Sequence, residues 1–195
     1  ALLAVFLFAF SPTIIAHSRF VTTDIAALFG VLFSSYFFVR YLERQTTRNF
    51  WLATISFGVA LLTKFSTFLL APYFILLALV WVWLNHRDFI KPAWNLLSKS
   101  ILIMAVGFVI IVGPIYQLHI LNYPAVQEKH DTTTILTNHP IPALVNLVIW
   151  ASDKPILRPY AQYGLGLAMV FQRVEGGNQT YFLGQLSNTS FKSYF

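Results

Sequence analysis

The sequence predicts an all-α, polytopic membrane helical bundle with about five spanning helices, followed by a long extracytoplasmic loop that carries short helices. Three observations predict this class. The chain of 195 residues is 57% hydrophobic and only 10% charged, whereas soluble domains carry roughly 25% charged residues. Its mean hydropathy is +0.65. Its apolar residues also gather in long runs. This composition excludes a soluble globule and a disordered chain.

The apolar runs have the lengths that membrane crossing requires. Between Phe50 and Asn85 the only charge is Lys64. One helix over those 36 residues would be about 54 Å long, too long for a hydrocarbon core of ~30 Å. Two crossings that meet near Lys64 fit better. The five predicted spans are 1–16 (interrupted at Ser11-Pro12, and expected to be part of a longer helix), 22–42, 46–63, 65–85 and 101–118.

The positive charges predict the orientation of the bundle. The linkers 40–49 and 86–100 together hold six of the 13 lysines and arginines. Loops rich in Lys and Arg stay on the cytoplasmic side of a membrane. The short connections on the opposite side carry only Arg19 and Lys64. Arg19, Asp24, Lys64 and the tail are therefore expected on the extracytoplasmic side.

The tail differs in composition from the apolar part of the chain. Residues 1–118 are predicted to be the transmembrane helical region, and residues 119–195 an extracytoplasmic loop that leads toward a further membrane helix. Five prolines interrupt the tail. Residues 142–151 are too short to span and are expected to lie in the interface. Residues 160–174 are expected to form another helix or a membrane-dipping segment.

Three charged residues at the ends of the predicted spans are the candidate site. A charge costs roughly 2.5–3.5 kcal/mol at the centre of a spanning helix, so charges near such helices are informative. Arg19 and Asp24 flank a tight turn, and each has a structural interpretation as an interfacial charge. The functional interpretation is that Arg19 and Lys64 hold an anionic group and that Asp24 orients a donor or a second cation. For Lys64 the structural alternative is a turn lysine whose ammonium extends to the interface.

Several chemistries lack their motifs. The chain has no cysteine, so disulfides, thiolate metal sites and cysteine nucleophiles are excluded. Its five histidines lack the spacing of a zinc site, and no phosphate-binding glycine loop occurs. The basic residues flank membrane spans without a nucleic-acid motif, so no nucleic-acid partner is expected.

Taken together, these segments resemble the protein O-mannosyltransferases of glycosyltransferase family 39, which are multi-spanning C-type glycosyltransferases. The resemblance rests on Ser11-Pro12 with IIAHSRFVTTD, on GVALLTKFSTFLLAP, and on the tail from Arg158 with its G-G-x-x-Y-F-L-G stretch. It implies a hexosyl- or pentosyltransferase that takes a sugar, often mannose, from a polyprenyl- or dolichyl-phosphate donor. The acceptor would be an extracytoplasmic protein, lipid or glycan.

The family motifs carry over onto Arg19, Asp24 and Lys64 as substrate-binding residues near the lipid phosphate. The resemblance places the catalytic acidic base upstream of Ala1, so this chain alone is expected to be inactive. It leaves a divalent metal cofactor open, and these residues contain no ligand set for one. The membrane would be the plasma or inner membrane in a prokaryote and the endoplasmic reticulum in a eukaryote.

Three alternatives remain open at the level of sequence. A polytopic transporter could use Asp24 and Lys64 along an ion or substrate path, although the inverted repeats common in transporters are not visible. A related C-type transferase, such as one that adds aminoarabinose to lipid A, would have the same fold and donor chemistry. A structural membrane protein would not need the three charges.

Overall fold

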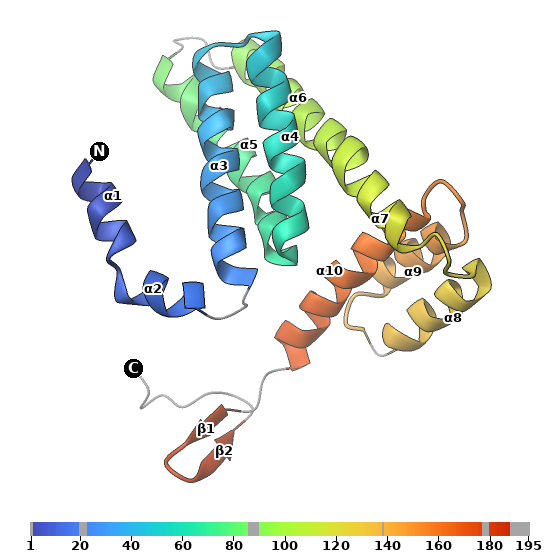
Figure 1. The fold of residues 1–195 in the computed structure, drawn as a ribbon. Helices are drawn as coiled ribbons and strands as arrows, with labels where there is room; N and C mark the ends of the chain where they lie inside the picture. Colours follow the sequence, from blue (N-terminus) through green and yellow to red (C-terminus); the bar gives the residue numbers. More distant parts are fainter. Residues whose placement is uncertain (1, 20–22, 86–89, 138, 177–179, 188–195) are drawn as a thin grey trace. The chain divides into compact units, whose positions relative to one another are not determined.

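The computed structural model describes residues 2–19, 23–85, 90–137, 139–176 and 180–187. The chain forms two compact units, residues 1–114 and residues 115–195, and each is described by itself. The described elements are almost all helices (Figure 1). This confirms the predicted all-α membrane bundle, with one small departure in the second unit.

The first unit is built around an antiparallel pair of helices, α3 (Thr23–Glu43) and α4 (Thr47–Thr63). The short connection between them is ordered by capping, because the Asn49 N–H donates to Thr46 Oγ1 at 3.3 Å. Small residues let the helices approach closely, and a Cβ on Gly30 would lie 3.2 Å from the Ala60 Cα. Such small contact residues are typical of helix packing in membranes.

The helix α5 (Leu70–Asn85) completes the core of this unit. Its Phe74 is fully buried and stacks on Phe38 of α3, with ring centroids 3.9 Å apart. Phe57 of α4 lies 5.7 Å from the same ring. One aromatic cluster therefore joins three helices.

Within the described residues, three helices are long and apolar enough to cross a membrane: Thr23–Glu43, Phe65–Asn85 and Ile90–His119. Helix α4 has 17 residues, or about 25 Å, close to the lower limit for a span. Much of the surface of the three longer helices is apolar and exposed, since only 28%, 28% and 39% of their apolar stretches is buried. That surface suits contact with lipid.

One predicted span and one predicted linker differ in the structure. Residues 1–16 do not form one helix, because the chain breaks at Ser11 between α1 (Leu2–Ala9) and α2 (Pro12–Arg19). The predicted linker 86–100 is helical from residue 90, where α6 (Ile90–Gly107) begins. This helix continues through the π-helical segment η2 (Phe108–Val112) into α7 (Gly113–His119). Ala93, Leu96 and Ser100 are buried at helical spacing, which explains why the helix extends beyond the apolar run.

Helices α4 and α6 cross with almost no space between their backbones. A Cβ on Gly107 would lie 2.5 Å from the Thr54 carbonyl oxygen, and one on Gly58 would lie 2.6 Å from the Gly107 carbonyl oxygen. Both obstacles are backbone atoms, which cannot rotate away.

We therefore expect Gly107→Ala to push the two helices apart and to destabilise the protein by about 1–3 kcal/mol. The thermal melting temperature of the purified protein in detergent measures this effect. Gly30→Ala is the graded control, because its nearest contacts are longer, at 3.2–3.3 Å. Equal melting temperatures for the wild type and Gly107→Ala would contradict the close crossing.

The second unit contains α8 (Ala125–Ile135), α9 (Pro142–Ser152) and α10 (Arg158–Gly176). The predicted helices at 142–151 and 160–174 are thus confirmed as helices, while their relation to the membrane stays a prediction. Leu136, Val148, Leu165 and Ala168 form their common core. A small hairpin of β1 (Thr180–Phe182) and β2 (Gln185–Ser187) follows, which the all-α prediction did not include. Leu183 and Gly184 form its turn, and both have positive φ angles, as a type I′ turn requires.

Candidate functional site

The predicted site residue Lys64 lies at a break between two helices. It ends α4 and precedes the 3₁₀ turn η1 (Phe65–Leu69), with an extended backbone at φ −162° and ψ 143°. Hydroxyl groups hold this break in place. The Thr67 hydroxyl lies 2.8 Å from the Ala60 carbonyl oxygen and 2.7 Å from that of Lys64. The sequence therefore presents one lysine from a fixed point between two apolar segments.

Asp24 lies opposite Lys64 because α3 and α4 run antiparallel. It occupies the first turn of α3, and its carboxylate accepts a hydrogen bond from Lys64 Nζ at 2.5 Å. The two side chains are 49% and 40% exposed. The structure thus joins two of the three predicted site residues, which lie 40 positions apart in the sequence.

Each charge of the ion pair also lies at the helix end where the helix dipole favours it. A carboxylate is favourable at a helix N-terminus and a cation at a C-terminus, each by about 0.3–1 kcal/mol. Exposed pairs of this kind contribute only about 0–1 kcal/mol to stability. Stability alone is therefore a weak reason for a charged pair beside apolar helices. A half-exposed ammonium with further N–H donors remains able to bind an anion.

Arg19, the third predicted residue, is the last residue of α2. Its side chain, like the turn residues 20–22, lies outside the described residues. The placement of Arg19 beside the pair therefore stays a prediction.

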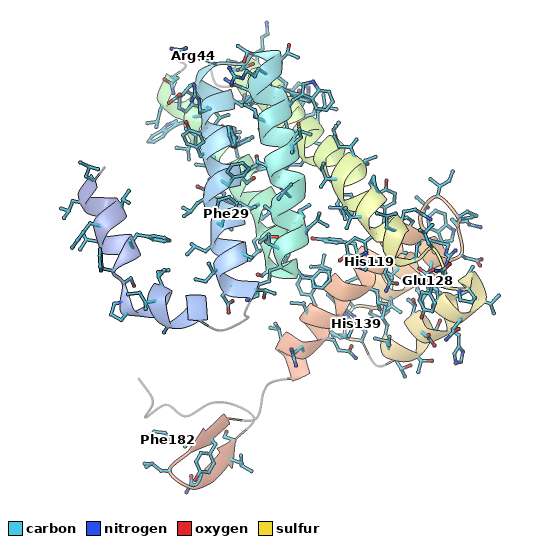
Figure 2. All side chains as sticks on the ribbon, viewed as in Figure 1. Phe29, Arg44, His119, Glu128, His139 and Phe182 are labelled. Atoms are coloured by element: carbon cyan, nitrogen blue, oxygen red, sulfur yellow. The ribbon has the colours of Figure 1, made fainter. Side chains whose placement is uncertain are left out.

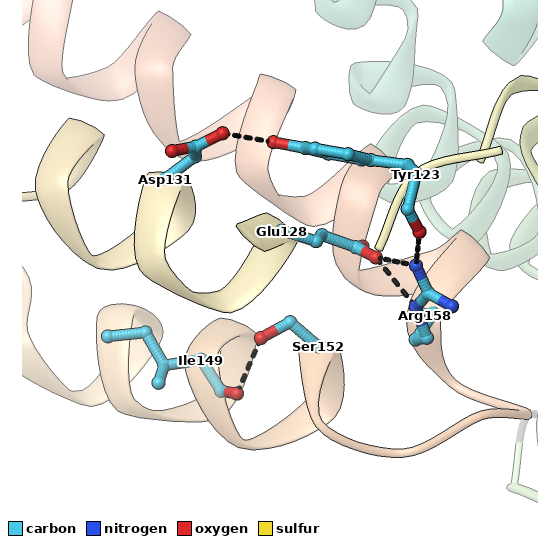
Figure 3. Close-up of polar contacts among 6 residues, drawn as sticks. All are labelled: Tyr123, Glu128, Asp131, Ile149, Ser152 and Arg158. Atoms are coloured by element: carbon cyan, nitrogen blue, oxygen red, sulfur yellow. Dashed lines mark hydrogen bonds and ion pairs between the residues drawn. The ribbon is translucent and has the colours of Figure 1, made fainter. Parts of the chain in front are cut away.

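A second polar cluster lies in the second unit (Figure 3). The Glu128 side chain is 1% exposed and pairs with Arg158, whose Nε donates to Glu128 Oε2 at 2.7 Å. Arg158 Nη2 also donates to the Tyr123 carbonyl oxygen at 2.6 Å. The Tyr123 hydroxyl donates to Asp131 at 2.5 Å. This bond, with a smaller contribution from burial, raises the pKa of Tyr123 to about 12, so Tyr123 is a neutral donor here.

Sequence reasoning missed this cluster. Glu128 and Arg158 lie 30 positions apart in a tail that the composition describes only as a loop. The sequence signal that could have found it is that Glu128 and Arg158 each lie in a short segment with the residue pattern of a helix. The cluster joins the start of α8 to the start of α10, which indicates a structural role.

Within the residues that the structure describes, no three histidine, aspartate or glutamate side chains lie close enough together to hold a metal ion.

The fold and the pair define a class: a polytopic α-helical membrane protein with a charged pair at one end of its bundle. The family profile for dolichyl-phosphate-mannose-protein mannosyltransferase matches residues 1–114. The chain belongs to this family, which is a family of membrane glycosyltransferases. The matched range is the same as the first compact unit. The resemblance of the tail lies beyond the match and stays a prediction.

No curated protein and no solved structure matches the chain at the threshold applied.

Proposed function

We propose that the protein transfers a sugar, most simply mannose, from a polyprenyl- or dolichyl-phosphate donor to an extracytoplasmic acceptor. The observation that carries this proposal is the Asp24–Lys64 pair, 2.5 Å across, in the part of the chain that matches the family. The pair lies at the end of α3 opposite the basic connection 40–49. That connection is the cytoplasmic one by the distribution of charge, so the pair would face the other side of the membrane.

The proposed role of Lys64 follows from the charge that develops during transfer. When the bond between the sugar and the lipid phosphate breaks, the departing phosphate gains negative charge. A positioned ammonium stabilises that charge without having to reorganise. Asp24 takes one of the three N–H donors of Lys64 among the described contacts and fixes its direction. Arg19, at the end of α2, is proposed as a second cation for the phosphate.

The acceptor hydroxyl must also lose a proton, and a carboxylate general base would remove it. None of the residues assigned here is proposed for that step. The proposed role of Arg19, Asp24 and Lys64 is limited to binding the donor phosphate and stabilising it as it leaves.

The test is a transfer assay on the full-length protein in membranes supplied with radiolabelled polyprenyl-phosphate mannose. Wild type is compared with Asp24→Asn, Arg19→Ala and Lys64→Ala at matched expression. Lys91→Ala is the control, because Lys91 is a lysine of the same unit on α6 and lines a pocket with Gln45, which follows the end of α3 opposite Asp24. We expect transfer by wild type and the control, and a strong loss in the three variants.

The other outcomes separate the alternatives. Transfer that survives all three substitutions would retain the enzyme and reject the site. No transfer from several lipid-linked sugars would reject the enzyme in favour of a transporter. Transfer of a sugar other than mannose, such as aminoarabinose onto lipid A, would indicate the related class of transferase.

A further inference from the structure

A basic pocket lies between the end of α3 and the start of α4, at the opposite end of α3 from Asp24. Its volume is about 360 Å³, and it is lined by Tyr36, Phe37, Arg40, Arg48, Asn49 and Leu52. Two arginines from different helices therefore line one pocket. The family profile and the proposed donor site give no role to these residues.

Hydrogen bonds within the connection between α3 and α4 order the backbone next to the pocket. Asn49 Nδ2 donates to the Arg40 carbonyl oxygen at 3.1 Å and to the Arg44 carbonyl oxygen at 2.8 Å. These bonds tie the start of α4 to the end of α3 and to the connection that follows it. The backbone that carries the two arginines is thus ordered before any ligand arrives, which lowers the ordering cost of binding.

The charge of the pocket is not neutralised within the described part of the chain. The ion pairs there join Lys64 to Asp24, Lys129 to Asp153 and Arg158 to Glu128. Arg40 instead donates to the Tyr36 hydroxyl at 2.9 Å and lies 5.8 Å from the centre of that ring. The nearest acid along α3 is Glu43, one turn away. Arg48 adds its charge at the N-terminus of α4, which also favours anions.

An aromatic strip on α3 leads to this pocket. Phe29 and Phe33 stack with centroids 5.2 Å apart, and Phe33 and Phe37 lie 4.8 Å apart. These residues are spaced four apart, so they lie along one face of the helix. Phe29 is 60% exposed. Figure 2 shows Phe29 on the body of α3 and Arg44 near the connection. An apolar strip therefore runs along α3 from its middle to the basic pocket.

We propose that this pocket binds the phosphate of an anionic phospholipid in the leaflet that faces the basic connections. The two guanidiniums would hold the phosphate oxygens through paired N–H donors. An acyl chain would lie along the strip of Phe29, Phe33 and Phe37. Anionic headgroups are recognised by basic pockets between helices on the cytoplasmic side of membrane proteins.

The general orientation effect of basic loops does not account for this arrangement. Orientation requires positive charge near the membrane and no particular geometry. Arg44 supplies such charge in the same connection but does not line the pocket. Arg44 is therefore the matched control for a specific site.

The test uses the purified full-length protein, stripped of lipid in a neutral detergent. Phosphatidylglycerol, phosphatidylcholine and inorganic phosphate are titrated separately, and the thermal melting temperature is followed. We expect phosphatidylglycerol alone to give a saturable rise. Arg48→Gln removes one charged donor, for which we expect an affinity about tenfold weaker. Arg44→Gln should bind as wild type does, and Arg40→Lys should bind more weakly because one ammonium lacks the planar pair of donors.

Each other outcome overturns the proposal. An equal loss in Arg44→Gln would mean general attraction rather than a site. An equal rise with inorganic phosphate would identify a free anion as the ligand, and an equal rise with phosphatidylcholine would mean that any lipid suffices.

Because the Arg48 side chain makes no hydrogen bond or ion pair in the described contacts, the Arg48→Gln variant should fold. Arg40→Lys tests the same pocket independently.

Discussion

Replacing Lys64 with alanine is expected to lower sugar transfer about 10²- to 10³-fold, the usual cost of removing one donor that stabilises developing charge. The loss has two sources. The leaving phosphate loses an ammonium, and the Asp24 carboxylate loses the hydrogen bond from Lys64. The extended backbone of Lys64, at φ −162°, is open to alanine, so the break between α4 and η1 should persist. Initial rates of transfer in membranes measure the effect.

Two further variants distinguish chemistry from folding in this prediction. Lys64→Arg keeps the positive charge and should retain more transfer than Lys64→Ala. Lys91→Ala removes a lysine from α6 and should transfer as wild type does. A loss of the same size in Lys91→Ala would mean that membrane-flanking charge in general, rather than Lys64, is what transfer needs.

Replacing Arg158 with alanine is expected to destabilise the second unit by about 3–5 kcal/mol, because removing one partner of a buried ion pair leaves an uncompensated charge. Glu128 is almost completely buried, and its Oε1 already lacks a hydrogen-bond partner among the described residues. Without Arg158 the carboxylate would also lose its bonds at Oε2. Amide hydrogen exchange in α8 and α10 reports this local loss directly.

The control for this prediction is the exposed pair of Lys129 and Asp153, which lie 3.2 Å apart on the same unit. Lys129→Ala should change stability by only about 0–1 kcal/mol, since water screens exposed pairs. If Arg158→Ala exchanged as slowly as wild type, the buried pair would not be holding α8 and α10 together.

The sequence predicted the parts of the fold that depend on apolar run length. The break at Lys64 follows from a run too long for one crossing, and the structure places a non-helical residue there. The start of α6 at Ile90 was missed because a prediction from uninterrupted apolar runs leaves out amphipathic helical segments. Only the pattern of Ala93 and Leu96 against the interior reveals that continuation.

The candidate site was predictable only in part. Charge rarity identified Asp24 and Lys64, while their contact depends on the antiparallel packing of α3 on α4, in which Gly30 meets Ala60. In the sequence, Arg40 and Arg48 indicated only the orientation of the bundle in the membrane. The pocket that they share depends on the hydrogen bond by which Asn49 joins the start of α4 to the end of α3. Pairings of this kind are set by tertiary structure and leave no local pattern in a single sequence.

A double-mutant cycle on Asp24 and Lys64 tests the central claim most directly. Transfer from radiolabelled polyprenyl-phosphate mannose is measured for wild type, Asp24→Asn, Lys64→Met and the double variant. If Asp24 acts by positioning Lys64, wild type transfers mannose, each single substitution lowers the rate, and the double variant is no slower than Lys64→Met. Losses that multiply, variants that all transfer as wild type does, or a wild type that transfers no mannose would contradict the account.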